Sequence, residues 1–416
     1  MKHTILLSFI VLTSSLALTA QNTNKAFAIV SNEIGKAGWM NIQEVDLSTG
    51  LITRTVFDKA KTPFILLDAS TKTQIASHGP GLVTKNEMRY EHPTATMVAA
   101  AAYDQRHNKL FFTPMRFGEL RWIDLSEKND VLKVYCLTDQ TFFFAEANNE
   151  AANVTRMVIA SDGNGYALSN DANHFVRFTT GKKPSVTYLG MLQDDEENAV
   201  TSIHNKSAWG GDMIADATGN LYVIAANHSV YKVDVRKRIA MHLGSIEGLP
   251  EKYTTNGAAI DKDGNLIVSS ALAVDGYYTC DLTTLKAKKH EAQNLVFSSS
   301  DLASGNLAFQ KQLDDFSKAP DQSVTLNFPQ NRVSLYPNPV SHGRFKLYFQ
   351  TSQKGQYDIQ VVALSGKVIS QRRVTIGVGG QTENIIMDSK LAKGLYIVKL
   401  LNPSKKLMSS GKIIFQ

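Results

Sequence analysis

The sequence predicts an all-β protein with two domains, a β-propeller of about six blades followed by a small β-sandwich. Two observations lead to this prediction. Turns rich in glycine and asparagine recur every 45 to 56 residues through most of the chain, each between two short apolar segments. The last 85 residues instead alternate apolar and polar side chains, which is the period of half-buried strands.

The repeat unit is predicted to be two consecutive hairpins. The first hairpin carries a turn asparagine, and successive ones are 56, 56 and 45 residues apart: Asn108, Asn164, Asn220 and Asn265. Turn sequences such as Asp-Gly-Asn supply the positive φ angles that tight hairpins need. The second hairpin follows at 44–51, 122–126, 231–235 and 278–282. A unit of about 45 residues with four antiparallel strands is typical of a propeller blade.

The propeller is expected to span residues 26–310, which corresponds to about six blades at this repeat length. Residues 58–93 contain one poor hairpin only, so five blades with a long insertion is the alternative. Residues 302–309 resemble one more innermost strand, whereas the first blade, beginning at 26–30, lacks one. We therefore expect the C-terminal strand to complete the first blade and close the ring, which removes the open sheet edges.

The C-terminal segment, residues 332–416, has the pattern of a β-sandwich. Tyr357, Ile359 and Val361 alternate with polar residues, and Ser365-Gly366 is a hairpin turn signal. The preceding residues 311–331 are rich in Gln, Asp, Ser and Lys and contain two prolines, so they are interpreted as an exposed linker.

Four separated motifs occur in order in this segment, at Tyr336-Pro337-Asn338-Pro339, Gly366-Lys367, Gly394-Leu395-Tyr396 and Lys412. With these motifs the segment resembles the C-terminal sorting domain of the type IX secretion system of Bacteroidota. The resemblance covers residues 332–416 only. It implies export by the type IX machinery, removal of the segment by a surface peptidase, and attachment to the outer membrane surface or release. The motif residues are Tyr336, Pro337, Asn338, Pro339, Gly366, Lys367, Gly394, Tyr396 and Lys412.

The N-terminus has the pattern of a secretory signal peptide of residues 1–20. A short basic start precedes an apolar run at 5–18 that is too short to span a bilayer, and small residues follow at 19–21. The signal predicts export through the periplasm. Since no other stretch is long and apolar enough for a membrane-spanning helix, no transmembrane segment is expected in the mature chain.

The charge of the chain argues against a nucleic-acid partner once it is divided by domain. The whole chain carries +6 with a sequence pI near 9.0. Residues 332–416 contain 13 Lys and Arg against 3 Asp and Glu, whereas residues 21–331 contain 30 against 35. The basic character therefore belongs to the segment that is expected to be removed, and the mature protein is mildly acidic.

Candidate site residues are expected where the innermost strands begin, because one residue per blade would point into the channel mouth there. The aligned positions form a set of convergent polar groups of the kind that small-molecule sites use: Thr96, Arg156, Asp212, Asn256 and Asn306. A water-filled channel mouth whose polar groups are merely solvated is the alternative interpretation.

Two classes of function follow. The absence of HExxH, GxSxG, P-loop and closely spaced His or Cys pairs favours a non-enzymatic binding module for a glycan, peptide or protein, with no cofactor. The alternative is a divalent-metal-dependent hydrolase or lyase, because the pattern resembles lactonase-like propellers that hold a cation at the channel mouth. Asp212, Asn256 and Asn306 match those ligands in type, and calcium is the candidate ion, although Arg156 would repel it.

Overall fold

The computed structural model describes residues 23–311 except 34, 80–87, 140–147, 199 and 291–297, and residues 324–415 except 328–331, 337, 341–342, 352–354, 364–365, 378–380, 389–390, 403 and 406. The predicted signal peptide of residues 1–20 lies outside the described residues. The described part is almost entirely β, with three short 3₁₀ helices, η1 (Met88–Tyr90), η2 (Glu196–Asn198) and η3 (Lys206–Ala208). The predicted all-β fold class, a propeller followed by a sandwich, is confirmed.

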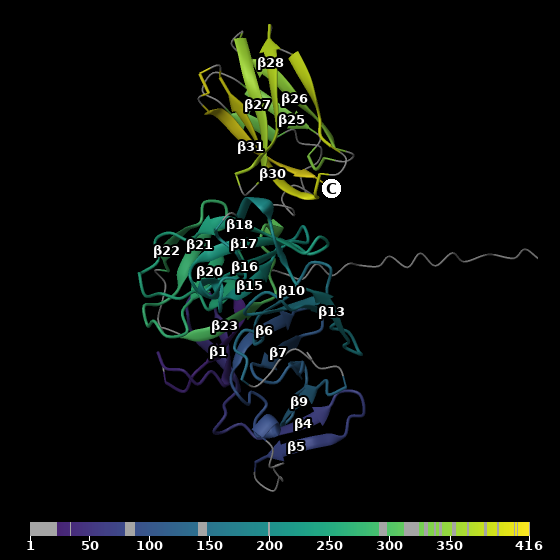
Figure 1. The fold of residues 1–416 in the computed structure, drawn as a ribbon, viewed down its shortest axis with the longest axis vertical. Coiled ribbons are helices and arrows are strands. Elements are labelled where there is room, and N and C mark those ends of the chain that lie inside the picture. Colours follow the sequence, from purple (N-terminus) through teal and green to yellow (C-terminus); the bar gives the residue numbers. More distant parts are fainter. Residues whose placement is uncertain are drawn as a thin grey trace, which may run out of the picture.

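Five blades make up the propeller in the described residues, so the alternative of five is correct and the expected six is not (Figure 1). Each blade has four antiparallel strands. The strands of each blade are given from the innermost outward. Blade 1 consists of β23 (Ser299–Ser304), β1 (Lys25–Val30), β2 (Asn41–Asp46) and β3 (Ile52–Phe57), and blade 2 of β6 (Val98–Asp104), β7 (Lys109–Pro114), β8 (Arg121–Asp124) and β9 (Leu132–Cys136). Blade 3 consists of β10 (Val154–Ile159), β11 (Gly165–Ser169), β12 (Phe175–Phe178) and β13 (Val186–Gly190), blade 4 of β15 (Asp212–Ala215), β16 (Leu221–Ile224), β17 (Ser229–Asp234) and β18 (Ile239–Ser245), and blade 5 of β19 (Gly257–Ile260), β20 (Leu266–Ser269), β21 (Tyr278–Asp281) and β22 (Lys286–Lys289).

The segment that was expected to supply a sixth blade forms an extension of blade 2 instead. Its hairpin, β4 (Phe64–Asp68) and β5 (Gln74–His78), adds to the outer edge of the blade, with β4 parallel to β9. A hairpin contributes two strands, which is too few for a blade, and pairing with β9 satisfies the backbone groups of that outer edge. In the same way, the short β14 (Gln193–Asp194) adds to the outside of blade 4, parallel to β18.

The ring is closed by the two ends of the propeller, as predicted. Strand β23 pairs antiparallel with β1, so that Leu302 lies opposite Ala28. The innermost strands then follow one another around the axis in the order β23, β6, β10, β15 and β19. The observed strand begins three residues before the expected residues 302–309 and ends at Ser304, and this shift affects the site prediction described below.

The innermost strands all run in the same direction, which defines two faces of the propeller. Where they begin, the Ser300 hydroxyl donates a hydrogen bond to the Val98 carbonyl over 2.7 Å. Where they end, the Ile260 N–H donates to the Ser304 hydroxyl over 3.1 Å. We call the side where these strands begin the N-face and the side where they end the C-face. The repeat turns recognised in the sequence lie on the C-face.

The C-terminal domain is a sandwich of two four-stranded sheets, and its alternating residues Tyr357, Ile359 and Val361 are buried in a common core with Phe345 and Phe415. Strand β24 lies within the segment that was interpreted as a linker. The first sheet contains β24 (Val324–Asn327), β25 (Arg332–Tyr336), β26 (Arg344–Thr351) and β29 (Gln381–Ile386); the second contains β28 (Val368–Ile376), β27 (Gly355–Ala363), β30 (Gly394–Leu401) and β31 (Leu407–Phe415).

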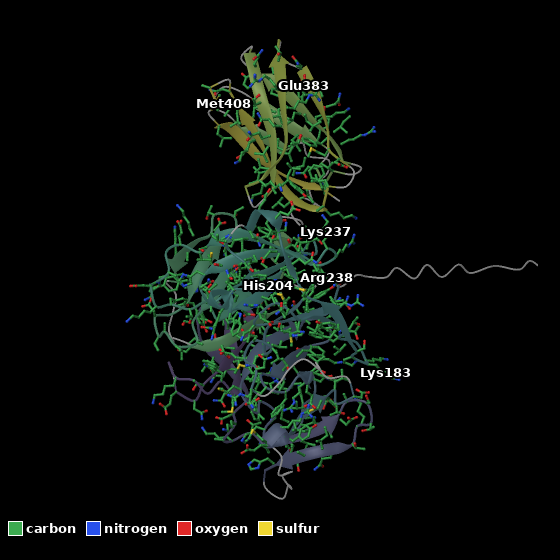
Figure 2. The ribbon with its side chains drawn as sticks, in the orientation of Figure 1. Lys183, His204, Lys237, Arg238, Glu383 and Met408 are labelled. Atoms are coloured by element: carbon green, nitrogen blue, oxygen red, sulfur yellow. The ribbon has the colours of Figure 1, made fainter. Side chains whose placement is uncertain are left out.

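The sandwich contacts the C-face side of blades 4 and 5, next to β17 and β18 in Figure 1. Lys237, labelled in Figure 2, lies on the part of the propeller nearest to the sandwich. Leu395 and Ile414 of the sandwich belong to the same hydrophobic cluster as Phe309 of the propeller. No helix in the described part of the chain is long and apolar enough to cross a membrane.

Candidate functional site: the central channel and the N-face

The central channel is narrow because its walls are built from small side chains. Ala101, Ala215, Ala258 and Ala303, each from a different innermost strand, line it. Its free space holds about one water molecule. Five innermost strands approach the axis more closely than six would, so alanine is the side chain that fits between them.

The C-face end of the channel is covered by the chain segment that leaves β23. The Ala308 N–H donates to the Ala215 carbonyl over 2.9 Å, and the Ala217 N–H donates to the Ala308 carbonyl over 3.0 Å. Phe309 then packs against Tyr222 with ring centroids 6.3 Å apart. The segment 305–309 therefore pairs with blade 4 across the channel exit before the chain continues toward the sandwich.

Asp212 is fully buried at the start of β15 and serves as an acceptor for backbone groups of three strands. Its carboxylate accepts hydrogen bonds from the N–H groups of Met213 at 2.6 Å, Ala258 at 2.7 Å and Leu302 at 3.1 Å. The inner edge of each innermost strand has no further strand to pair with, so its N–H groups need another acceptor. Asp212 supplies that acceptor for blades 4, 5 and 1.

Asp301 is the second carboxyl group of the channel, and sequence reasoning missed it. It is fully buried, and the hydrogen-bonding groups beside it are the Ala101 N–H and the Asp212 carboxyl group. Burial raises the pKa of Asp301 well above its usual range, and the charge of Asp212 raises it further. Burial also raises the pKa of Asp212, to about 8, against the effect of its three N–H donors. The pair therefore holds at least one proton at neutral pH, and the three N–H donors reduce the cost of a charge on Asp212 relative to one on Asp301.

The structure places three of the five predicted site residues at the N-face ends of innermost strands. They are Thr96, Asp212 and Asn256. Thr96 precedes β6 with a φ angle of +64° and accepts a hydrogen bond from the Arg116 N–H over 3.4 Å. Asn256 precedes β19, and its side-chain oxygen accepts the Ala271 N–H over 3.1 Å. The prediction that these residues form a ligand site stays a prediction.

Arg156 is not a channel-mouth group. Its side chain is fully buried, and its guanidinium group donates hydrogen bonds of 2.5 to 3.3 Å to the carbonyls of Ser169, Asn170, Ala208 and Gly210. Burial lowers the pKa of Arg156 to about 10, which leaves it charged at neutral pH. Arg156 therefore holds the connection that leads to blade 4 against blade 3, and backbone carbonyls occupy the N–H donors of its guanidinium group.

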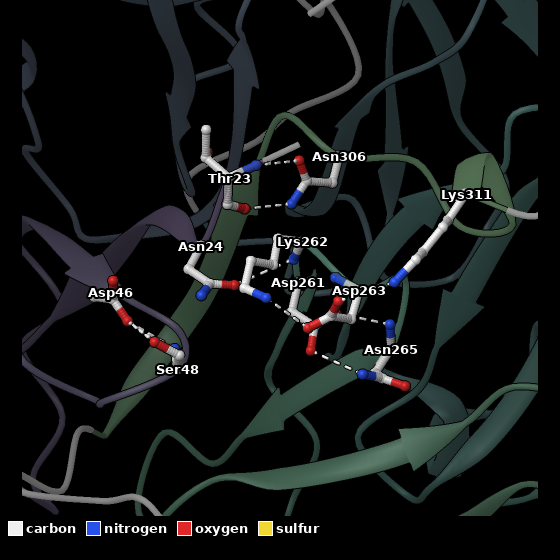
Figure 3. A network of polar contacts seen from close by, with 10 residues as sticks. All are labelled: Thr23, Asn24, Asp46, Ser48, Asp261, Lys262, Asp263, Asn265, Asn306 and Lys311. Atoms are coloured by element: carbon white, nitrogen blue, oxygen red, sulfur yellow. Dashed lines mark hydrogen bonds and ion pairs between the residues drawn. The ribbon is translucent and has the colours of Figure 1, made fainter. Parts of the chain in front are cut away.

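Asn306 lies at the opposite end of the channel, so its alignment with the other four residues was wrong. It follows the end of β23, and its amide donates to the Ile260 carbonyl at 2.8 Å. Figure 3 shows its other hydrogen bond, of 2.6 Å, to the Thr23 carbonyl. Both partners are on the C-face. Because the strand ends at Ser304, the residues of β23 that begin on the N-face are Ser299 and Ser300. The unusual run Ser298-Ser299-Ser300-Asp301 before an apolar pair was the signal that could have located Asp301.

The N-face carries exposed apolar side chains on a loop that Asn256 helps to hold. Leu272 and Val274, in the connection between β20 and β21, are 52% and 53% exposed. The Ala273 N–H donates to the Ser270 hydroxyl over 3.0 Å, which adds to the Asn256 hydrogen bond at Ala271. Val274 also lies beside Gly35 of blade 1, where an added Cβ atom would approach its Cγ2 to 2.9 Å. The loop is therefore fixed at both ends and against its neighbour.

Blade 2 has a comparable buried anchor on the N-face. Arg121 and Glu119 are both fully buried and form an ion pair of 2.6 Å. The Arg121 guanidinium also donates to the carbonyls of Arg89 and Pro93, over 2.8 and 2.7 Å. It holds the returning end of the insertion against the blade. No group of three or more His, Cys, Asp or Glu side chains that could hold a metal occurs among the residues that are described.

The sorting-motif residues gather at one end of the sandwich. The Asn338 amide donates to the Lys412 carbonyl over 3.1 Å, and its oxygen accepts the Ile414 N–H over 2.9 Å. Gly394 is paired with Phe415. Ala363, at the end of β27, is paired with Tyr396, so the turn containing Gly366 and Lys367 lies at the same end. Tyr336 and Pro339 flank Asn338, whereas Pro337 lies outside the described residues.

Residues 334–416 match the family model described as the secretion system C-terminal sorting domain. This match confirms that the chain carries the sorting domain of a type IX secretion cargo, which the type IX machinery exports to the cell surface or the medium. A search of curated protein sequences found no match.

Solved structures match the chain at low similarity. The extracellular domain of a one-component system from B. thetaiotaomicron is 9% identical, with 91% of this chain and 46% of that chain covered and a TM-score of 0.32. PorZ, a surface component of the type IX secretion system of Porphyromonas gingivalis, is 13% identical, with 92% and 56% covered and a TM-score of 0.31. Virginiamycin B lyase from Staphylococcus aureus is 11% identical, with 76% and 84% covered and a TM-score of 0.28. The chain spans about half the length of the first two.

Proposed function

We propose that the mature protein is a non-enzymatic binding module of the cell surface, and that its N-face binds a peptide or protein partner. The observation that carries the proposal is the blade 5 loop with Leu272 and Val274, two aliphatic side chains about half exposed on a fixed backbone. Exposed apolar groups on a loop that a rigid scaffold positions are typical of protein interaction sites.

Rigidity of the N-face supports the same proposal. The buried cations Arg121 and Arg156 bond to backbone carbonyls of the connections before blades 2 and 4. Because these hydrogen bonds hold the connections in place, the connections would lose little conformational entropy when a partner binds. Apolar side chains on ordered backbone favour a protein or peptide over a glycan, whose hydroxyl groups need polar partners.

The place of the sorting domain is compatible with this use of the N-face. The sandwich lies against the C-face side, so among the described residues it does not cover the N-face before its removal. We propose that a surface peptidase cuts in the segment 311–331 and that the mature propeller stays attached to the outer membrane or is released.

The proposal is tested with peptide and glycan arrays probed by the mature protein purified from the cell surface. The variant Leu272→Ser with Val274→Ser should lose about tenfold or more in binding to the peptides that the wild type selects, because both apolar contacts are removed. Leu51→Ser is the matched control, since Leu51 is also 43% exposed but lies on the C-face. Binding to glycans alone, with both variants equal to wild type, would refute the proposal.

A second candidate is a cation held in the channel, favoured by the two fully buried carboxyl groups of Asp301 and Asp212, which lie beside each other. Two carboxylates at one point would attract calcium or another hard cation in place of the proton. Calcium titration followed by calorimetry tests it. Heat of binding in the wild type that disappears in Asp301→Asn would support the metal-dependent alternative, and no heat in either protein would remove it.

A further inference from the structure

A surface of the sandwich, which we call the motif end, consists of the loop around Asn338, the turn at Gly366 and Lys367, and the strand ends at Gly394–Tyr396 and Lys412–Ile414. Hydrogen bonds and strand pairing bring these four segments together. In the precursor the centre of this surface does not face solvent, because it lies against blades 4 and 5 of the propeller, whereas Gly366, Lys367 and Lys412 stay exposed around it. This arrangement concerns the opposite face of the propeller from the proposed binding site and does not depend on it.

The centre of the contact is apolar. Leu395 and Ile414 are directly paired on neighbouring strands and are 5% and 2% exposed. Their neighbours Tyr396, Ile413 and Phe415 point into the sandwich core, so strand alternation directs Leu395 and Ile414 outward. Both belong to the cluster of blade residues that includes Leu282, Leu285 and Phe309. An outward apolar pair on a sandwich edge is therefore buried by the propeller.

The rim of the contact is charged, with lysines on the sandwich and carboxylates on the propeller. The Lys367 ammonium lies 2.5 Å from the Glu197 carboxylate. The pKa of Asp281 is lowered although burial opposes this, through hydrogen bonds from Thr283 and Thr284 and through the charge of Lys412. Gly394 lies beside Thr218 of the blade 4 turn, 3.7 Å from the position of an added Cβ atom to the hydroxyl oxygen.

The fit between the two domains is incomplete, which distinguishes it from a permanent interface. A cavity of about 330 Å³ remains between them, with Lys232, Lys237 and Met241 on the propeller and Leu391 and Tyr396 on the sandwich. The Lys367–Glu197 pair is about half exposed, so it adds little to the attraction. Permanent interfaces pack at the density of a protein interior, whereas transient ones are smaller and more polar.

We propose that the propeller occupies the motif end of its own sorting domain in the folded precursor, in competition with the secretion machinery, and that this surface takes a partner with an apolar centre flanked by carboxylates. The propeller itself presents that chemistry, with Leu282 and Phe309 near the centre and Glu197 and Asp281 at the rim. The component of the machinery that replaces the propeller must itself present apolar side chains to Leu395 and Ile414 and carboxylates to Lys367 and Lys412. Separation of the two domains then precedes recognition.

The test uses the full-length chain with changes on the propeller side only, so that the sorting motifs stay intact. Glu197→Lys combined with Asp281→Asn removes the acidic rim, and the asparagine still accepts the N–H groups of Thr283 and Thr284. Glu251→Lys is the matched control, because Glu251 is exposed on the connection before blade 5, on the N-face. Thermal unfolding of the propeller confirms that each variant is folded.

Two readouts decide the proposal. Amide hydrogen exchange in residues 391–396 and 412–414 should be about two- to fivefold faster in the double variant than in the wild type and the control. Pulse-labelled export to the cell surface should be faster in the double variant by a similar factor. Equal exchange in all three proteins would show that the two rim carboxylates do not hold the domains together, which removes the charge complement on which the proposal rests. Faster exchange with unchanged or slower export would show that the machinery does not compete for this surface. Both outcomes overturn the proposal, and neither affects peptide binding by the mature N-face.

Discussion

The pair of carboxyl groups in the channel makes the stability of the propeller depend on pH in an unusual direction. Burial holds the pKa of Asp212 near 8 rather than its ordinary 3.8, and burial together with the charge of Asp212 raises the pKa of Asp301 well above the same ordinary value. For acids whose pKa is higher in the folded state, the folded state binds more protons than the unfolded state between the two values. The stabilisation is therefore complete below about pH 4 and is lost as the pH rises toward 8 and above.

The magnitude follows from the size of the pKa change. One proton held to about pH 8 instead of 3.8 represents about 6 kcal/mol at 1.36 kcal/mol per pH unit. Entry of water into the channel on ionisation offsets part of this energy, so we expect a net loss of at least about 2 kcal/mol between pH 5 and pH 9.

The variant Asp301→Asn isolates the effect, because the amide is the neutral isostere of the protonated acid. It should match the wild type at pH 5 and be more stable than the wild type at pH 9 by about 2 kcal/mol. The free energy of unfolding is measured by denaturant titration at several pH values. Equal pH dependence in the two proteins would show that the pair does not share a proton.

Asp212→Asn is the contrasting variant at the same site. The amide offers one oxygen to the three N–H groups of Met213, Ala258 and Leu302. Buried donors would be left without acceptors, so the variant should be less stable by about 2–3 kcal/mol at both pH values. A loss confined to one end of the pH range would contradict this account.

Three further predictions concern the fold and export. Arg156→Ala should lower the free energy of unfolding by about 3–5 kcal/mol, because four buried carbonyls lose their donor. Arg156→Lys should recover little of this stability, since one ammonium group cannot reach all four carbonyls. Denaturant titration measures both variants, and a loss below about 1 kcal/mol in Arg156→Ala would contradict the assigned role. A chain ending at residue 300 loses most of β23 and should aggregate or unfold without cooperativity, as light scattering and calorimetry would show; normal stability would mean that ring closure does not depend on this strand. Deletion of residues 332–416 should leave a folded propeller in the periplasm and none on the surface, and mass spectrometry of the wild-type surface form should find a C-terminus within 311–331; intact sorting domain on most surface molecules would refute its removal.

Repeat spacing and turn residues were enough to predict the propeller, its closure and the sandwich, because these features are local. A positive φ angle at a turn such as Asp261–Asn265, or alternation such as Tyr357–Val361, depends on a few neighbouring residues. The number of blades was not local in this sense. Whether a hairpin such as β4–β5 starts a blade or extends one depends on pairing with β9, which lies about 70 residues further along the chain.

The site residues were predicted less well, for a related reason. Thr96, Asp212 and Asn256 were placed at the correct end of the channel because the strands after them have clear starts. Asn306 was assigned to the wrong end because β23 begins three residues earlier than its apolar residues suggest. Arg156 occupies an inner strand but its long side chain reaches the next blade connection, which strand position alone does not show.

The sequence by itself determined the all-β class, the propeller and sandwich, and the export route, since the sorting motifs are short and contiguous and are recognised without a structure. Tertiary structure decided the number of blades, the pairing of Asp212 with Asp301, and the contact between the motif end and blades 4 and 5. Each of these depends on side chains from segments distant in the chain that meet in one place. Their energies depend on burial and charge at that place, which a linear pattern of residue types does not contain.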